Sequence, residues 1–191
     1  EAFSAIRACS VVKLHYRLFN DSDEREVILS PYLLKEYNRR WYLIGAADDT
    51  GKILTFALDR ILSIEVLPSY EFREAPDDLS ERYEDIIGVS YYEDREIQKI
   101  LFWVSDKSAP YVDTKPLHGS QINLRGEKER LLREQYSVPA GGAFFTIECL
   151  ENYELIRELG SFGGELKVLS PQPIVDSIKQ RIQSMVDIYQ M

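Results

Sequence analysis

Apolar and polar residues alternate in the first third of the chain in a way that predicts a small β-structure. Strand-like runs of alternating or continuous apolar residues cover residues 11–18, 25–34, 40–47, 52–58 and 61–67. Turn-forming residues separate them, such as Asn-Asp-Ser-Asp at 20–23 and Asp-Asp-Thr-Gly at 48–51. Pro31 lies inside the second run, which predicts an edge strand or a bulge because proline cannot donate to a ladder. Five short strands with tight turns predict a small, strongly bent sheet or barrel.

The segments that flank this β-region have a different character. Residues 1–9 resemble the end of a helix, and the chain starts without a methionine, which favours a fragment of a longer protein. Residues 68–80 lack periodicity and contain two prolines, so they predict a linker. A short helix is expected over residues 79–86, ending before Gly88.

The second half alternates strands with helices. Strands are expected over residues 97–104, 117–124, 143–150 and 166–169, and helices over residues 106–113 and 152–160. Asp106 and Asn152 are the predicted N-caps of these helices, and Gly160 is the predicted stop of the second. The order βαββαβ is the ferredoxin-like pattern. Residues 126–142 fit a helix, a strand or a loop equally well.

A terminal helix is expected after Ser170-Pro171, since serine and proline favour the first positions of a helix. Its apolar residues recur at helical spacing, which predicts that this stripe packs on another surface. The stripe consists of Ile174, Ile178, Ile182 and Met185.

Charge limits the classes of partner. The net charge is −9, and residues 71–191 carry fourteen basic against twenty-two acidic residues. Tight binding of duplex DNA needs clustered basic charge, so this chain is not expected to bind duplex by itself. No apolar run reaches the length of a membrane span, and no signal peptide is present at the start. Cys9 and Cys149 are isolated, which favours a reducing cytoplasm over a disulfide-bonded compartment.

Catalytic and metal-binding motifs are not found in the sequence. It lacks the common nucleophile, zinc-protease and phosphate-loop patterns, and its two histidines are far apart. We therefore expect no enzymatic activity, no cofactor and no metal ion.

The most informative stretch is residues 30–61, where cations are interleaved with aromatic residues. The cations are Lys35, Arg39, Arg40 and Arg60, and the aromatic residues are Tyr32, Tyr37, Trp41 and Tyr42. Such a mixture suits a ligand with negative charge and flat rings. The structural alternative places Trp41 and Leu43 in the core and neutralises Arg60 with Asp59.

Strand parity adds positional detail to this stretch. Arg40 and Tyr42 share one face of their strand. Ser30 and Tyr32 share the face opposite the apolar side chains of their strand, on which Val27, Leu29 and Leu33 are expected.

Three sequence blocks in this stretch resemble the WYL domain. They are Pro31-Tyr32, Trp41-Tyr42-Leu43 and Leu58-Asp59-Arg60-Ile61, in order and at similar spacing. The second half is similar to the WCX extension that follows WYL domains. Its matching blocks are Ile87-Gly88-Val89, Asn152-Tyr153-Glu154-Leu155, Phe162-Gly163 and Val168-Leu169-Ser170-Pro171.

The resemblance implies an α+β protein with a small Sm-like β-barrel, a ferredoxin-like domain and a C-terminal helix. The implied boundaries are a linker-helix end at 1–9, the WYL barrel at 10–70, a linker at 71–95 and the WCX extension at 96–191. WYL domains are regarded as ligand-sensing modules of bacterial transcription regulators. The ligand-binding positions that match here are Tyr16, Ser30, Tyr32, Arg40, Tyr42 and Arg60.

Several functions remain compatible with this resemblance. The first is a homodimeric sensor of a small anionic ligand or single-stranded nucleic acid, with duplex DNA bound only through an N-terminal domain outside this chain. The alternatives are a dimerisation module without a ligand and an Sm-like module that binds RNA or single-stranded DNA.

Overall fold

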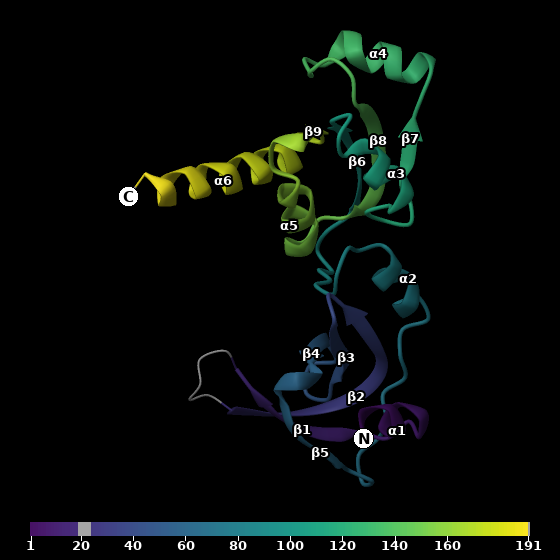
Figure 1. The fold of residues 1–191 in the computed structure, drawn as a ribbon. Coiled ribbons are helices and arrows are strands. Elements are labelled where there is room, and N and C mark those ends of the chain that lie inside the picture. The colour runs from purple at the N-terminus through teal and green to yellow at the C-terminus, as the bar shows by residue number, and fades with distance from the viewer. Residues whose placement is uncertain (19–23, 191) are drawn as a thin grey trace. The chain divides into compact units, whose positions relative to one another are not determined.

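The computed structural model describes residues 1–18 and 24–190, so the turn predicted at 20–23 lies outside the described residues. The chain divides into two compact units, Glu1–Ser80 and Glu81–Met191 (Figure 1). Each unit is built around its own antiparallel sheet with helices, which confirms the predicted α+β class.

The first unit is a five-stranded sheet with one short helix. Its elements are α1 (Ala2–Arg7), β1 (Val12–Arg17), β2 (Glu24–Tyr37), β3 (Arg40–Ala47), β4 (Ile53–Ala57), the 3-10 helix η1 (Leu58–Arg60) and β5 (Ile61–Val66). The strand order is β4-β3-β2-β1-β5. The expected barrel is therefore not closed. Within the described residues β5 pairs with β1 at the edge opposite β4, because η1 turns the chain away from β4.

The central strand β2 contains the predicted irregularity at Pro31. Its ladder with β3 shifts register between Pro31 and Leu33, which leaves Tyr32 as the extra residue of a β-bulge. Because one extra residue reverses the alternation, Leu34 packs against the core cluster that contains Leu29. The expectation that Leu33 shares this face is wrong, since Leu33 lies opposite Ile44 on the other face.

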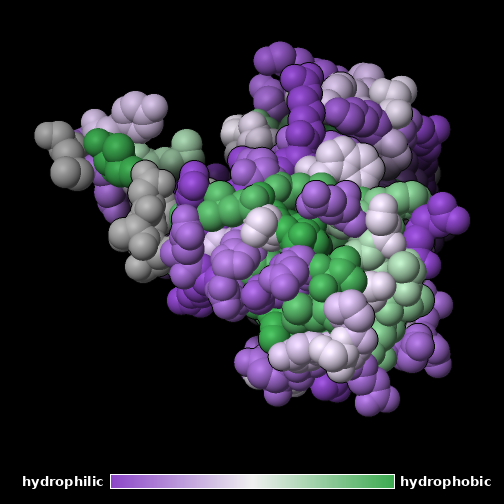
Figure 2. Space-filling model, turned by 90° about the horizontal axis from the view of Figure 1, so that it is seen from below, coloured by the Kyte–Doolittle hydropathy of each residue, from purple (hydrophilic) through white to green (hydrophobic). Residues whose placement is uncertain are grey.

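A hydrophobic core cluster of the first unit covers one face of the sheet. Its buried members are Ala2, Ala5, Val12, Leu14, Tyr16, Leu29, Leu43 and Phe56. Trp41 is 52% exposed and not in this core, because it lies opposite Glu36 near the β2–β3 turn, beyond the buried residues. Figure 2 shows apolar side chains gathering on the face of the molecule that is seen from below. Phe3 of α1 and Leu62 and Val66 of β5 are exposed apolar residues.

The second unit has the ferredoxin-like order of strands and helices with one additional helix. The helix α2 (Leu79–Glu84) includes the residue at which the first unit ends and the second begins. The elements that follow are β6 (Ile97–Val104), α3 (Ala109–Thr114), β7 (Ile122–Leu124), α4 (Glu127–Gln135), β8 (Ala143–Leu150), α5 (Tyr153–Ser161), the 3-10 helix η2 (Gly163–Glu165), β9 (Leu166–Ser170) and α6 (Gln172–Tyr189). The sheet order β7-β8-β6-β9 places the first and third strands at the centre, as in ferredoxin-like domains.

The predicted caps have different outcomes. Asn152 caps α5 as expected, since its Oδ1 accepts a hydrogen bond from the backbone N–H of Leu155 at 2.8 Å. Asp106 does not cap α3, whose first flanking residue is Ser108. The Asp106 carboxylate instead accepts a hydrogen bond from the backbone N–H of Gly142 at 2.6 Å.

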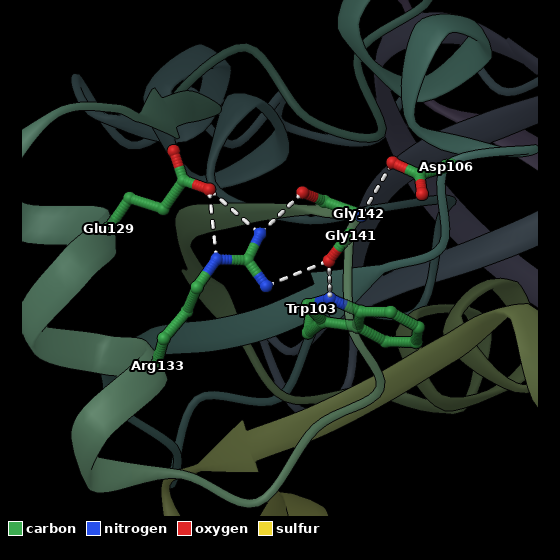
Figure 3. Close-up of polar contacts among 6 residues, drawn as sticks. All are labelled: Trp103, Asp106, Glu129, Arg133, Gly141 and Gly142. Carbon is green, nitrogen blue, oxygen red and sulfur yellow. Dashed lines mark hydrogen bonds and ion pairs between the residues drawn. The ribbon is translucent and has the colours of Figure 1, made fainter.

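Residues 126–142, whose structure the sequence leaves open, form α4 and a loop that returns to β8 (Figure 3). Arg133 holds this loop. Its guanidinium donates to the carbonyls of Gly141 and Gly142 at 2.8 and 2.7 Å. It also contacts one carboxylate oxygen of Glu129 through two nitrogens, at 3.1 and 2.7 Å. The indole N–H of Trp103 donates to the same Gly141 carbonyl at 3.1 Å.

The terminal helix α6 packs along only its first half. Ile174 is fully buried, whereas Ile182 and Met185 are 55% and 53% exposed. The predicted stripe therefore finds a partner within the described residues only near its start. The reason is length: α6 has eighteen residues and extends past the nine-residue α5 beside which it lies (Figure 1).

The two cysteines differ in environment. Cys9 follows α1 and is exposed, while Cys149 is buried in β8. Burial, together with the nearby charge of Asp85, raises the pKa of the Cys149 thiol to about 12. The thiol of Cys149 is therefore protonated and unreactive at neutral pH.

We expect Arg133→Gln to destabilise the second unit. The variant removes charge-assisted hydrogen bonds to two loop carbonyls, and each such bond contributes about 1.5–3 kcal/mol. Chemical denaturation should show a loss of at least this size. Arg130→Gln on the same helix is the matched control, because its ion pair with Glu134 is exposed at 62% on both sides and contributes little. Equal stability of the two variants would contradict the role assigned to Arg133.

Candidate functional site

The six ligand-binding positions expected from the sequence all lie in the first unit and are described in three groups. They are Tyr16 with Arg60, Ser30 with Tyr32, and Arg40 with Tyr42. Each group uses a different strand or turn to position its side chains.

Tyr16 and Arg60 form a cation–aromatic pair. The guanidinium carbon of Arg60 lies 4.8 Å from the centre of the Tyr16 ring. The ring itself is buried against Phe56 at an edge-on distance of 5.0 Å, and the hydroxyl accepts a hydrogen bond from the backbone N–H of Ala57 at 3.3 Å. This bond supplies the partner that a buried tyrosine hydroxyl needs. The Tyr16 ring therefore provides the surface on which the Arg60 guanidinium lies, and contacts with Phe56 and Ala57 of β4 fix the position of the ring.

Ser30 and Tyr32 contact the segment that follows β5. The Ser30 hydroxyl accepts a hydrogen bond from the backbone N–H of Arg73 at 3.0 Å, and the Tyr32 hydroxyl donates to the Glu74 carbonyl at 3.2 Å. Tyr32 also lies edge-on to Phe72 at 5.9 Å. Burial raises the pKa of the Tyr32 hydroxyl, partly offset by the charge of Arg73, so the hydroxyl stays protonated and can donate.

The segment 72–74 was expected to be part of a linker, yet it contacts both hydroxyl residues of the predicted site. We call it the strap. The sequence contains no periodicity over these residues that could have indicated this contact. Arg73 further anchors the strap, since its guanidinium lies 3.5 Å from the Asp48 carbonyl.

Arg40 and Tyr42 lie on β3 and face away from the core. Tyr42 is next to the buried Leu43 in a strand, so their side chains point to opposite faces. Arg40 forms an ion pair with Asp59 at 3.1 Å, with side-chain exposures of 42% and 52%. Tyr16, by contrast, lies on the core side, so the structure does not gather all six residues on one face.

The turn η1 is the point that links two of the three groups. It carries Asp59, which binds Arg40, and the adjacent Arg60, which stacks on Tyr16. Two guanidinium groups from distant parts of the sequence are therefore attached to one three-residue turn. Each of these arginines suits an anion with several oxygen atoms, since a guanidinium can donate two parallel hydrogen bonds.

Comparison with known protein families now gives this arrangement a context. The WYL domain matches residues 1–66 and the WCX domain matches residues 96–186. The chain therefore contains a WYL domain followed by a WCX domain. The WYL match contains all six candidate residues, and the strap follows it in the sequence.

Two solved structures illustrate the likeness. Proteasome accessory factor B/C (PafBC) of Arthrobacter aurescens is 17% identical, over 97% of this chain and 26% of that chain, with a TM-score of 0.39. A protein described as CRISPR Cas-related is 14% identical, over 98% of this chain and 49% of that chain, with a TM-score of 0.52. The WYL–WCX chain thus spans half or less of the length of either protein. No curated protein matches it.

A membrane-spanning segment was also sought. None of the helices formed by residues 1–18 and 24–190 is both long and apolar enough to cross a bilayer.

We expect Arg40→Gln to lower the free energy of unfolding by only about 0–1 kcal/mol, because the ion pair with Asp59 is exposed to solvent. Asp59→Asn removes the other partner and should give a similarly small change. Urea denaturation of both variants measures this. A loss of several kcal/mol in either variant would show that the pair has a structural role that its exposure does not indicate.

Proposed function

We propose that this chain is the ligand-sensing regulatory region of a cytoplasmic bacterial transcription factor. Its WYL domain binds an anionic nucleotide or a nucleic-acid single strand. The observation that carries the proposal is the attachment of Arg40 and Arg60 to the turn η1, with the Tyr16 ring beneath Arg60. Guanidinium groups recognise phosphate, and Tyr42, on the same face of β3 as Arg40, offers an aromatic ring for stacking on a base.

Binding at this site exchanges existing contacts for new ones. A ligand phosphate replaces the Asp59 carboxylate as the partner of Arg40, which is a small loss because the ion pair is exposed. To reach the hydroxyl groups of Ser30 and Tyr32, the ligand must displace the strap, which holds them through Arg73 and Glu74. In this proposal the position of the strap therefore depends on whether a ligand is bound at the site.

The regulatory output of the proposed factor lies outside this chain. With a net charge of −9, the chain itself offers few counterion-releasing contacts to duplex DNA. In this proposal duplex DNA is bound by a separate domain of the complete protein, and the ligand acts on that domain at a distance.

We expect Arg40→Gln and Arg60→Gln each to weaken binding of short single-stranded oligonucleotides about ten- to a hundred-fold, since each removes charge-assisted hydrogen bonds to phosphate. Fluorescence anisotropy against oligonucleotides and isothermal titration against nucleotides measure the effect. Arg7→Gln, an exposed arginine on α1, removes the same charge from the same unit and should leave binding unchanged. If the parent chain binds neither class of ligand, the proposal fails.

The structure also supports a second candidate, a dimerisation module without a ligand. The specific observation is the second half of α6, where Ile182 and Met185 are exposed beside an apolar cavity of about 580 Å³. Leu159, Leu166 and Val186 also line this cavity. Exposed apolar side chains next to an apolar cavity are typical of a self-complementary interface between two copies of one chain.

We expect the parent chain to sediment as a dimer at micromolar concentration and the double variant Ile182→Lys with Met185→Lys to sediment as a monomer. Charged side chains at the centre of an apolar interface prevent its burial. Gln183→Lys places the same charge on a polar, exposed position of α6 and should leave the dimer intact. A monomeric parent chain, or a double variant that remains dimeric, would argue against this interface.

A further inference from the structure

A polar groove lies on the second unit, separate from the WYL site. It has a volume of about 470 Å³ and is bordered by the segment before β6, the start of α5 and the middle of α6. Its volume is within the range of about 300–1,000 Å³ that small-molecule sites occupy. The side chains that matter for its chemistry are Tyr92, Arg95, Glu151, Tyr153 and Arg181.

One wall of the groove is a fixed cation–aromatic pair. The guanidinium carbon of Arg95 lies 4.7 Å from the centre of the Tyr92 ring. The same guanidinium donates to the Glu151 backbone carbonyl at 3.1 Å and lies 3.7 Å from the Glu151 carboxylate. The Ser177 hydroxyl donates to that carboxylate at 3.2 Å. Glu151 thus offsets the charge of Arg95 and holds its guanidinium over the Tyr92 ring.

Another part of the groove is lined by Arg181, a cation without an ion-pair partner among the described residues. Arg181 forms no hydrogen bond or ion pair with any residue in the described part of the chain. Its position is defined by close packing, because a Cβ at Gly160 would come within 3.1 Å of Arg181 Cδ and 3.2 Å of Nε. The guanidinium of Arg181 is therefore available to an anion that enters the groove.

Two further features favour an anion with an aromatic ring. The helix α5 begins at the groove, and the N-terminal end of a helix carries partial positive charge. Tyr153, its first residue, lines the groove and is 59% exposed. A flat ring placed against Tyr153 or the Arg95–Tyr92 pair removes apolar surface from water.

We propose that this groove binds a small anion that carries a flat ring, of the nucleoside monophosphate class. Arg181 binds the phosphate, and Tyr153 and the Arg95–Tyr92 pair stack on the base. The site belongs to the second unit, and the proposal does not depend on ligand binding by the WYL domain.

The test is isothermal titration of the whole chain with the four common ribonucleoside monophosphates. We expect at least one of them to bind with one-to-one stoichiometry. Arg181→Gln should weaken this binding about tenfold or more, the effect of losing hydrogen bonds to a charged group. Tyr153→Ala should weaken it by a similar factor, because the variant removes the aromatic face on which the base stacks.

Two controls make the result specific. Lys179→Gln removes a positive charge from the same helix at an exposed position outside the groove and should not change the affinity. The double variant Arg40→Gln with Arg60→Gln should also retain full affinity, which separates this groove from the WYL site. Failure of all four nucleotides to bind, or loss of binding in either control, overturns the proposal. Equally tight binding of inorganic phosphate overturns the assignment of a ring-stacking surface.

Discussion

Proline cannot donate a backbone hydrogen bond, and the WYL domain contains one in the middle of its central strand. The strand accommodates Pro31 with a bulge at Tyr32, and the geometry of the domain depends on that bulge. Opposite Pro31, Gly45 allows the two strands to approach, since a Cβ there would collide with the backbone of Ser30 and Pro31. Because of the bulge, Leu29 and Leu34 both face the core although they are an odd number of positions apart in the strand. The hydroxyl of the bulged Tyr32 donates to the strap.

In the WCX domain the backbone hydrogen-bond ladder is likewise interrupted, at the loop before β8. There the chain leaves α4 through Gly141 and Gly142, whose positive φ values of 77° and 71° take them out of a regular ladder. Side chains then supply the missing hydrogen bonds: Arg133 and Trp103 donate to the carbonyls, and Asp106 accepts from the Gly142 N–H. In both domains polar side chains complete the backbone bonding where regular structure stops, which buried backbone groups require.

The sequence predicts the regular parts of this protein well and its irregular contacts poorly. Most strands of both sheets follow from alternating or continuous apolar runs, and the start of α5 follows from the cap formed by Asn152. The face of Leu34 could not be predicted, because the presence of a bulge can be inferred from Pro31 but its parity cannot. The hydrogen-bond partners of Ser30 and Tyr32 could not be predicted from the sequence either. The strap has no periodic pattern, and the residues that it contacts are more than forty positions away in the sequence. Long-range contacts of irregular segments depend on three-dimensional packing and leave little trace in local sequence.

The contrast between the two cysteines has a practical consequence for studying the chain. Cys149 is buried with a thiol that remains protonated, while Cys9 is exposed just after α1. A maleimide fluorophore or a nitroxide spin label applied to the unmodified protein will therefore attach at Cys9 alone. The native chain already contains a single-site spectroscopic handle in its WYL domain, and no cysteine has to be removed or introduced to use it.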